Sequence, residues 1–156
     1  MTIPPQMIGN LVRATEEVFE TMVFKSVSAQ EPIADGSFRP VSNVVASVAF
    51  AGYRCGLVAF HSSTGAARDI AGAMLGIPPA SVNGEMPDAI GEIANMIAGT
   101  LRTKMAEVEP AWAIAVPTVT IGSDFSTKYP TDVTRLLLPF SMEGQSIFVE
   151  LILTGR

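Results

Sequence analysis

One order of elements occurs twice along the chain, and this repeat restricts the fold more than any other feature. Residues 4–24 predict a helix that opens on two prolines and carries its apolar residues on one stripe, and about three predicted strands follow it. Residues 86–106 predict a second proline-led helix with about three more strands. The pairs Ile8-Gly9 and Ile90-Gly91 lie 82 residues apart (90 − 8 = 82) in a chain of 156. The order predicts an α+β fold built from two related halves, each a helix plus three strands.

The segments between and after these helices predict short strands joined by turns. The strands are expected at residues 25–32, 41–52, 53–61, 113–122, 134–142 and 145–155. Turns are expected at Ala34-Asp35-Gly36, Ala51-Gly52 and Glu143-Gly144, and the last two make hairpins of the strands they join. Residues 63–75 predict a short helix that Ser62, Ser63 or Thr64 can cap. We therefore expect helices packed on one mainly antiparallel sheet.

Composition and charge narrow the classes of function. Hydrophobic residues make up 48% of the chain and charged residues 16%, which is enough to bury a core as a single domain over residues 1–156. Fifteen acidic against ten basic residues give a net charge of −5, so the sequence offers no basic stripe for nucleic acid or an anionic membrane. A signal-peptide pattern and an apolar run of membrane-spanning length are both missing, and a soluble cytoplasmic protein is expected.

The chain has one cysteine and one histidine, which limits redox and metal chemistry. Cys55 cannot form an intramolecular disulfide, and we interpret it as a small core or interface residue. His61 stands beside two serines, but the chain has no strained nucleophile turn such as Gly-x-Ser-x-Gly, so a catalytic role for His61 is disfavoured. Trp112 is interpreted as a core or interface residue.

The helix expected at 86–106 carries polar residues at helical spacing on the side opposite its apolar face. Its apolar face is defined by Ile90, Ile93, Ile97 and Leu101. The opposite face gathers Asp88, Gly91, Glu92, Asn95, Gly99 and Arg102. Each interior glycine costs the helix roughly 1 kcal/mol relative to alanine, a cost that bare backbone beside another molecule would explain. A solvated helix face with incidental glycines is the alternative, and composition alone favours it.

The spacing within and after this helix resembles the signature of the CheC/CheX/FliY phosphatases of bacterial chemotaxis. That signature is Glu-x-x-Asn on a helix with a proline 22 positions later. Here Glu92-x-x-Asn95 is followed by Pro117 (95 + 22 = 117). The resemblance is closest to CheX and extends to the first helix, the half-repeat and the total length. It departs at Thr100, where CheX-like sequences commonly have asparagine, and the helical wheel places Thr100 toward the buried side.

The resemblance implies a hydrolase that removes the phosphoryl group from the aspartate of CheY or a similar response regulator. Asn95 would orient the attacking water, and Glu92 would pair with the active-site lysine of the regulator. The other residues implied are partner contacts at Asp88, Gly91, Gly99 and Arg102 and a structural role for Pro117. The regulator would carry the Mg²⁺, and this chain would bind no cofactor. The resemblance, together with the apolar strands, also implies a homodimer.

The first helix lacks the Glu-x-x-Asn pattern, so one active site is expected rather than two. Alignment of Ile8-Gly9 with Ile90-Gly91 puts Asn10 at the position of Glu92 and Arg13 at the position of Asn95. A non-catalytic module that docks response regulators or flagellar-switch components remains the alternative function. A hydrolase of small phosphoesters is disfavoured, because the chain offers neither a metal site nor a nucleophile–base pair.

Overall fold

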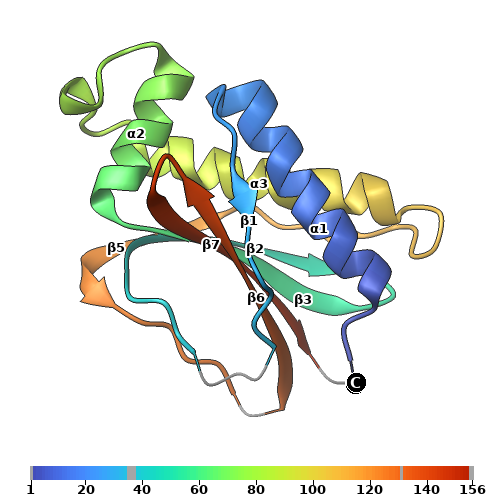
Figure 1. The fold of residues 1–156 in the computed structure, drawn as a ribbon. Helices are drawn as coiled ribbons and strands as arrows, with labels where there is room; N and C mark the ends of the chain where they lie inside the picture. Colours follow the sequence, from blue (N-terminus) through green and yellow to red (C-terminus); the bar gives the residue numbers. More distant parts are fainter. Residues whose placement is uncertain (1, 35–37, 131, 155–156) are drawn as a thin grey trace.

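Three helices cover one face of a seven-stranded sheet in the computed structural model, which describes residues 2–34, 38–130 and 132–154 (Figure 1). The helices are α1 (Pro5–Val18), α2 (Thr64–Leu75) and α3 (Met86–Met105). A π-helical turn (Phe19–Val23) extends α1, and a 3₁₀ turn (Pro79–Ser81) precedes α3. The strands are β1 (Ser28–Ala29), β2 (Ser42–Ala51), β3 (Cys55–Ser62), β4 (Ala113–Ile114), β5 (Thr118–Phe125), β6 (Val133–Met142) and β7 (Gln145–Thr154).

The sheet is antiparallel, and its strand order shows the two halves directly. The order is β1-β6-β7-β3-β2, and β4 and β5 both pair with the outer side of β2. Exchange of β1, β2 and β3 with β5, β6 and β7 reproduces this order in reverse. Each half therefore pairs its edge strand with the middle strand of the other half, and β3 and β7 meet at the centre. The predicted α+β fold with pseudo-symmetric halves is confirmed.

Local signals explain where most elements begin and end. Pro5 and Pro87 lie in the first turns of α1 and α3, where a missing N–H costs nothing. The Ser63 Oγ accepts a hydrogen bond from the Ala66 N–H at 3.1 Å and caps α2, as one of the three expected residues. Glu143 and Gly144 have φ values of 50° and 80°, the left-handed pair that closes a two-residue hairpin. Both predicted hairpins form.

The strand predicted at 113–122 divides into β4 and β5. Phe50 pairs with Ile114 and Ser47 pairs with Thr118, so three residues of one strand oppose two of β2. Pro117, the last of the three, has no N–H to donate to the ladder, which is why the pairing breaks there. The strand predicted at 25–32 is also shorter than expected, because only Ser28–Ala29 forms β1. The turn predicted at Ala34-Asp35-Gly36 lies mostly outside the described residues.

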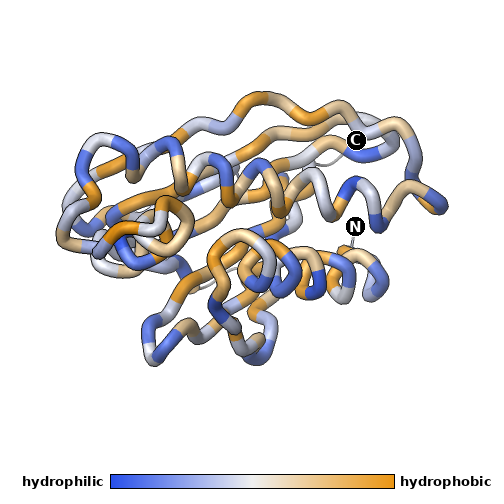
Figure 2. The backbone as a smooth tube through the Cα atoms, turned by 90° about the horizontal axis from the view of Figure 1, so that it is seen from above, coloured by the Kyte–Doolittle hydropathy of each residue, from blue (hydrophilic) through white to orange (hydrophobic). Residues whose placement is uncertain are grey.

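The main core lies between the sheet and the helices. Its largest fully buried side chains include Phe19, Phe60 and Phe140. Apolar and polar residues alternate along the helices in the view from above, as one buried face per helix requires (Figure 2), whereas the central strands β3, β6 and β7 carry continuous buried runs. Trp112 is buried and stacks on Phe50 with ring centroids 4.4 Å apart, which confirms its core role. Cys55 is exposed because it begins β3 at the tip of the hairpin, which excludes the core alternative expected for it and leaves the interface alternative as a prediction.

Candidate functional site

Helix α3 has one face in the core and the opposite face in solvent. Its buried side carries Ile90, Ile93, Ile97 and Leu101, each with no exposed surface, and packs against α1, α2 and the sheet. These are the residues predicted for the apolar face. Because burial fixes the rotation of the helix, the polar residues on its other side must point outward.

Glu92 and Asn95 lie on the outward face of α3, one turn apart. Glu92 is exposed and Asn95 is half-buried, and Asp88 is exposed one turn before Glu92. Among the described residues, none of these three side chains takes part in a hydrogen bond or an ion pair. An amide that can donate and accept therefore stands beside a free carboxylate on a rigid helix, available to a group from outside.

Gly91 is buried, whereas the sequence predicted that its bare backbone would face a partner. A Cβ at residue 91 would lie 3.2 Å from Val119 Cγ2 and 3.5 Å from Pro117 Cγ. Pro117 directly precedes β5 and Val119 is its second residue, so the chain crosses α3 at the point where β5 begins. The missing side chain of Gly91 thus accommodates the same chain, and Pro117 fills the space beside it.

Gly99 differs from Gly91, because its backbone is open to solvent. A Cβ at residue 99 would have nothing within 4 Å. A shallow, open hollow of about 390 Å³ lies over this position on the surface of α3 and is lined by Asn95, Met96, Gly99, Thr100, Arg102 and Thr103. Thr100 is half-buried, in line with its expected position toward the buried side, and it also lines the hollow together with Asn95. A helical side chain leans over the turn that precedes it, which brings Thr100 toward the edge of this hollow.

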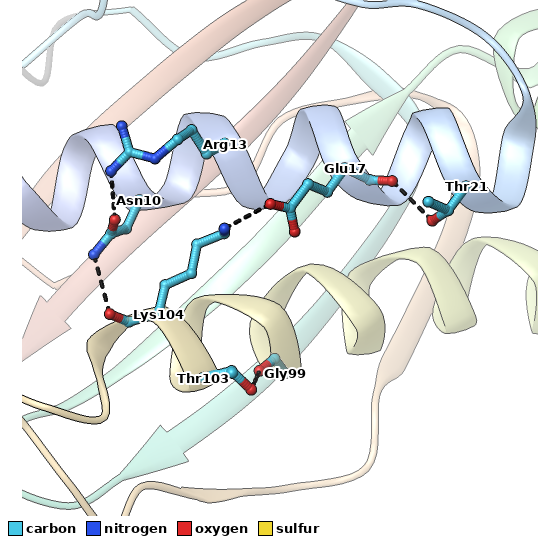
Figure 3. A network of polar contacts seen from close by, with 7 residues as sticks. All are labelled: Asn10, Arg13, Glu17, Thr21, Gly99, Thr103 and Lys104. Carbon is cyan, nitrogen blue, oxygen red and sulfur yellow. Dashed lines mark hydrogen bonds and ion pairs between the residues drawn. The ribbon is translucent and has the colours of Figure 1, made fainter.

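Polar contacts with α1 hold the C-terminal end of α3 (Figure 3). Lys104 Nζ lies 2.6 Å from Glu17 Oε1, and the Asn10 amide donates to the carbonyl of Lys104 at 3.4 Å. Arg13 donates to Asn10 Oδ1 at 2.6 Å. Asn10, the counterpart of Glu92 in the first half, is buried and joins the two helices, and Arg13, the counterpart of Asn95, holds Asn10 from within α1.

Comparison with known protein families bears on this helix and on the strand that crosses it. The model of the family described as chemotaxis phosphatase CheX matches residues 44–141, which is more than half of the chain. The chain belongs to the CheX family. The matched stretch contains the whole of α3 together with Pro117, so it includes the three motif residues Glu92, Asn95 and Pro117. A search of the curated protein sequences gave no match.

Solved structures of CheX-family proteins have the same fold. CheX from Desulfovibrio desulfuricans is 24% identical with a TM-score of 0.85, covering 95% of this chain and 99% of that one. CheX from Vibrio vulnificus is 23% identical with a TM-score of 0.86 and the same coverage. CheX in the CheX–CheY–BeF₃–Mg²⁺ complex from Borrelia burgdorferi is 19% identical with a TM-score of 0.79, covering 96% and 98%. These structures show the fold, and membership of the CheX family supports a role in chemotaxis.

His61 lies away from the CheX motif, on the other face of the sheet. Phe60 packs against Phe19 beneath the helices, and neighbouring strand residues point to opposite faces. His61 Nε2 lies 2.9 Å from Glu150 Oε1, and Ser42 Oγ lies 3.3 Å from His61 Nδ1. Arg135 Nε donates to the other oxygen of Glu150. All but Arg135 are at least 97% buried, so this arrangement is structural.

Three residues beside the motif had no signal of their own in the sequence. Val119 covers Gly91, and Met96 and Thr103 line the hollow around Gly99. Met96 and Thr103 lie three and four residues from Gly99, which is the spacing of neighbours on a helix surface. That spacing was the available signal for the hollow. No helix in the described part of the chain is long and apolar enough to cross a membrane.

Proposed function

We propose that this CheX-family chain removes the phosphoryl group from the phospho-aspartate of a CheY-like response regulator. The observation that carries the proposal is the position of Glu92 and Asn95, one turn apart on the outward face of α3. The similar chain from Borrelia burgdorferi was solved with CheY, BeF₃ and Mg²⁺, which is a further reason to choose a CheY-like partner.

The reaction is the hydrolysis of an acyl phosphate. A water attacks phosphorus in line with the aspartyl oxygen, the phosphorus–oxygen bond breaks, and inorganic phosphate leaves as the carboxylate is restored. Such a reaction needs mainly positioning of the water and the exclusion of unproductive geometries. The Asn95 amide would accept a hydrogen bond from the water and donate one to the phosphoryl group. Because an amide is uncharged, it approaches the phosphoryl oxygens without repulsion.

Glu92 has a separate role in this proposal. Its free carboxylate would pair with the active-site lysine of the regulator and fix the register of α3 in the site. A charge-assisted hydrogen bond of this kind contributes about 1.5–3 kcal/mol. Asp88, one turn earlier, would add a docking contact at the edge. Mg²⁺ would be held by the regulator, where it neutralises charge that develops on the phosphoryl oxygens.

The quaternary state belongs to the same proposal. Within the described ranges, β5 pairs with β2 alone, and six of its eight residues are exposed. An exposed edge strand presents unpaired backbone groups to another strand. We expect a homodimer that covers this edge, measurable by light scattering after gel filtration. A monomer at micromolar concentration would contradict this part of the proposal.

The decisive experiment measures phosphate release from a phosphorylated CheY-type regulator with Mg²⁺. We expect acceleration by the wild-type chain and a loss of about a hundredfold or more for Asn95→Ala, since a misplaced reacting group costs that much. Asn83→Ala, at an exposed site before α3, is the control and should retain activity. Equal activity of Asn95→Ala and wild type would refute the role of Asn95. Binding without acceleration, tested over several regulators, would instead indicate a non-catalytic docking module.

A further inference from the structure

The hollow around Gly99 is next to the proposed reaction site and continues toward the end of α3. Asn95, Gly99 and Arg102 follow each other at spacings of four and three residues, so they form one line along the outward face. Apart from the adjoining backbone of α3 itself, no atom of the described residues lies within 4 Å of the position that a Cβ at residue 99 would take. Alanine would therefore fit here and would favour the helix more than glycine does. The isolated chain gives no packing reason for glycine at this position.

Arg102 supplies a positive charge at the far end of the hollow. The last turn of α3 has two basic residues, Arg102 and Lys104. Lys104 is bound to Glu17 at 2.6 Å, so its charge is directed toward α1. Arg102 is exposed, and it makes no hydrogen bond or ion pair with any other residue that the structure describes. Its guanidinium is thus available to a group that enters the hollow.

We propose that this hollow receives a carboxylate-bearing main-chain segment of the response regulator, at the rim of its phosphorylation site. Gly99 lets the main chain of that segment approach α3 closely, and Arg102 binds the carboxylate. The inference rests on the proposed function, which brings α3 against the regulator. A site that binds Mg²⁺ is surrounded by oxygen ligands, largely carboxylates, and this acidic rim is complementary to Arg102. The planar guanidinium can hold a carboxylate by two parallel hydrogen bonds.

Distance separates this role from catalysis. Seven residues of α-helix rise about 10 Å, so the Arg102 backbone is that far along the axis from the backbone of Asn95. Arg102 therefore acts on binding of the regulator and not on the reacting atoms. Arg102 could also act structurally, since a cation in the last turn complements the helix dipole. In that case its removal would change the stability of the chain without changing its affinity for the regulator.

The test compares Gly99→Ala, Arg102→Gln and Arg102→Lys for KM and kcat in phosphate release. It also measures Kd for a CheY-type regulator activated with beryllofluoride, and the melting temperature of each variant. We expect Gly99→Ala to melt at a higher temperature than wild type, with KM and Kd raised about tenfold and kcat within about twofold. Arg102→Gln should raise KM by a similar factor and weaken the salt dependence of Kd, and Arg102→Lys should restore part of both.

Two matched controls lie on α2, away from the hollow. Gly65→Ala changes another helical glycine, whose added Cβ would be 3.7 Å from the nearest side chain, and Arg68→Gln removes another exposed arginine. Neither should change KM or Kd. Unchanged KM and Kd in both Gly99→Ala and Arg102→Gln would overturn the inference, while the loss of activity in Asn95→Ala would leave the phosphatase proposal standing. If wild type binds without acceleration, Kd alone decides the inference. If wild type neither binds nor accelerates, both proposals fail.

Discussion

Pro117 and Val119 both lie against Gly91: a methyl group at residue 91 would be 3.2 Å from Val119 Cγ2, a tight approach, and 3.5 Å from Pro117 Cγ, an ordinary van der Waals contact. These contacts bring the residue 22 positions after Asn95 against the helix beside Glu92. The chain leaves β2 at the break between β4 and β5 and passes over α3 where the helix has no side chain. Glu92 follows Gly91 directly, so the crossing strand bounds the outward face beside it.

Gly91→Leu tests this contact through stability. A leucine has no room under β5, and such overpacking typically costs about 1–3 kcal/mol in the free energy of unfolding. Urea denaturation measures the loss. Gly99→Leu is the matched control on the same helix, and we expect it to equal or exceed wild-type stability because its surroundings are open. Equal effects of the two substitutions would show that the contact with Pro117 does not constrain residue 91.

Asn95→Asp tests why the motif uses an amide. The substitution keeps the shape of the side chain but adds a negative charge beside the phosphoryl group and removes the N–H donors. We expect kcat for regulator dephosphorylation to fall about a hundredfold or more, at least as far as in Asn95→Ala. Activity that recovers at low pH in Asn95→Asp, as the new carboxyl becomes protonated, would support the charge argument. A fully active Asn95→Asp would contradict it.

Glu92→Gln removes one charge from the same face. Loss of a charge-assisted hydrogen bond to the regulator should lower kcat/KM by about tenfold or more. Steady-state phosphate release over a range of regulator concentrations gives the value. Glu16→Gln removes an exposed carboxylate from α1 and serves as the control. A matching decrease in both variants would mean that overall charge, and not the position of Glu92, determines the rate.

Tyr129 provides a stability prediction at high pH. Burial raises the pKa of Tyr129 to about 12, with a further rise from Glu150 and an opposing effect of Arg135. Between its ordinary value near 10 and 12, the folded chain keeps a proton that the unfolded chain loses, so folded stability falls as pH rises. The free energy of unfolding of wild type should decrease over this interval more steeply than that of Tyr129→Phe. Parallel curves for the two proteins would refute the shift.

The buried polar network around Glu150, on the face of the sheet opposite the helices, should contribute more to the free energy of unfolding than a surface ion pair does. Glu150→Ala leaves His61 and Arg135 without the carboxylate that contacts both. Removal of one partner from such a buried group costs about 3–5 kcal/mol in the free energy of unfolding. Glu17→Gln removes the exposed pair with Lys104 and should cost less than about 1 kcal/mol. Urea denaturation measures the loss of stability in each variant. Similar losses in Glu150→Ala and Glu17→Gln would contradict this prediction.

The sequence by itself determined the features that depend on local spacing. The apolar positions of 86–105 fixed which side of the helix is buried, and hence that Glu92 and Asn95 face outward on one turn. Turn residues at Ala51-Gly52 and Glu143-Gly144 determined the hairpins. The repeated order of helix and strands predicted two halves, because each half supplies the same faces for burial.

Only the tertiary structure decided the features that depend on which segments meet. Gly91 and Gly99 look alike in the sequence, yet β5 covers the first and leaves the second open. Thr100 joins the hollow and Cys55 reaches solvent, because exposure depends on neighbouring elements and not on spacing along one of them. The helical period determines the direction in which each side chain leaves the helix axis. Which segment, or solvent, that side chain meets depends on contacts with strands and helices far apart in the chain.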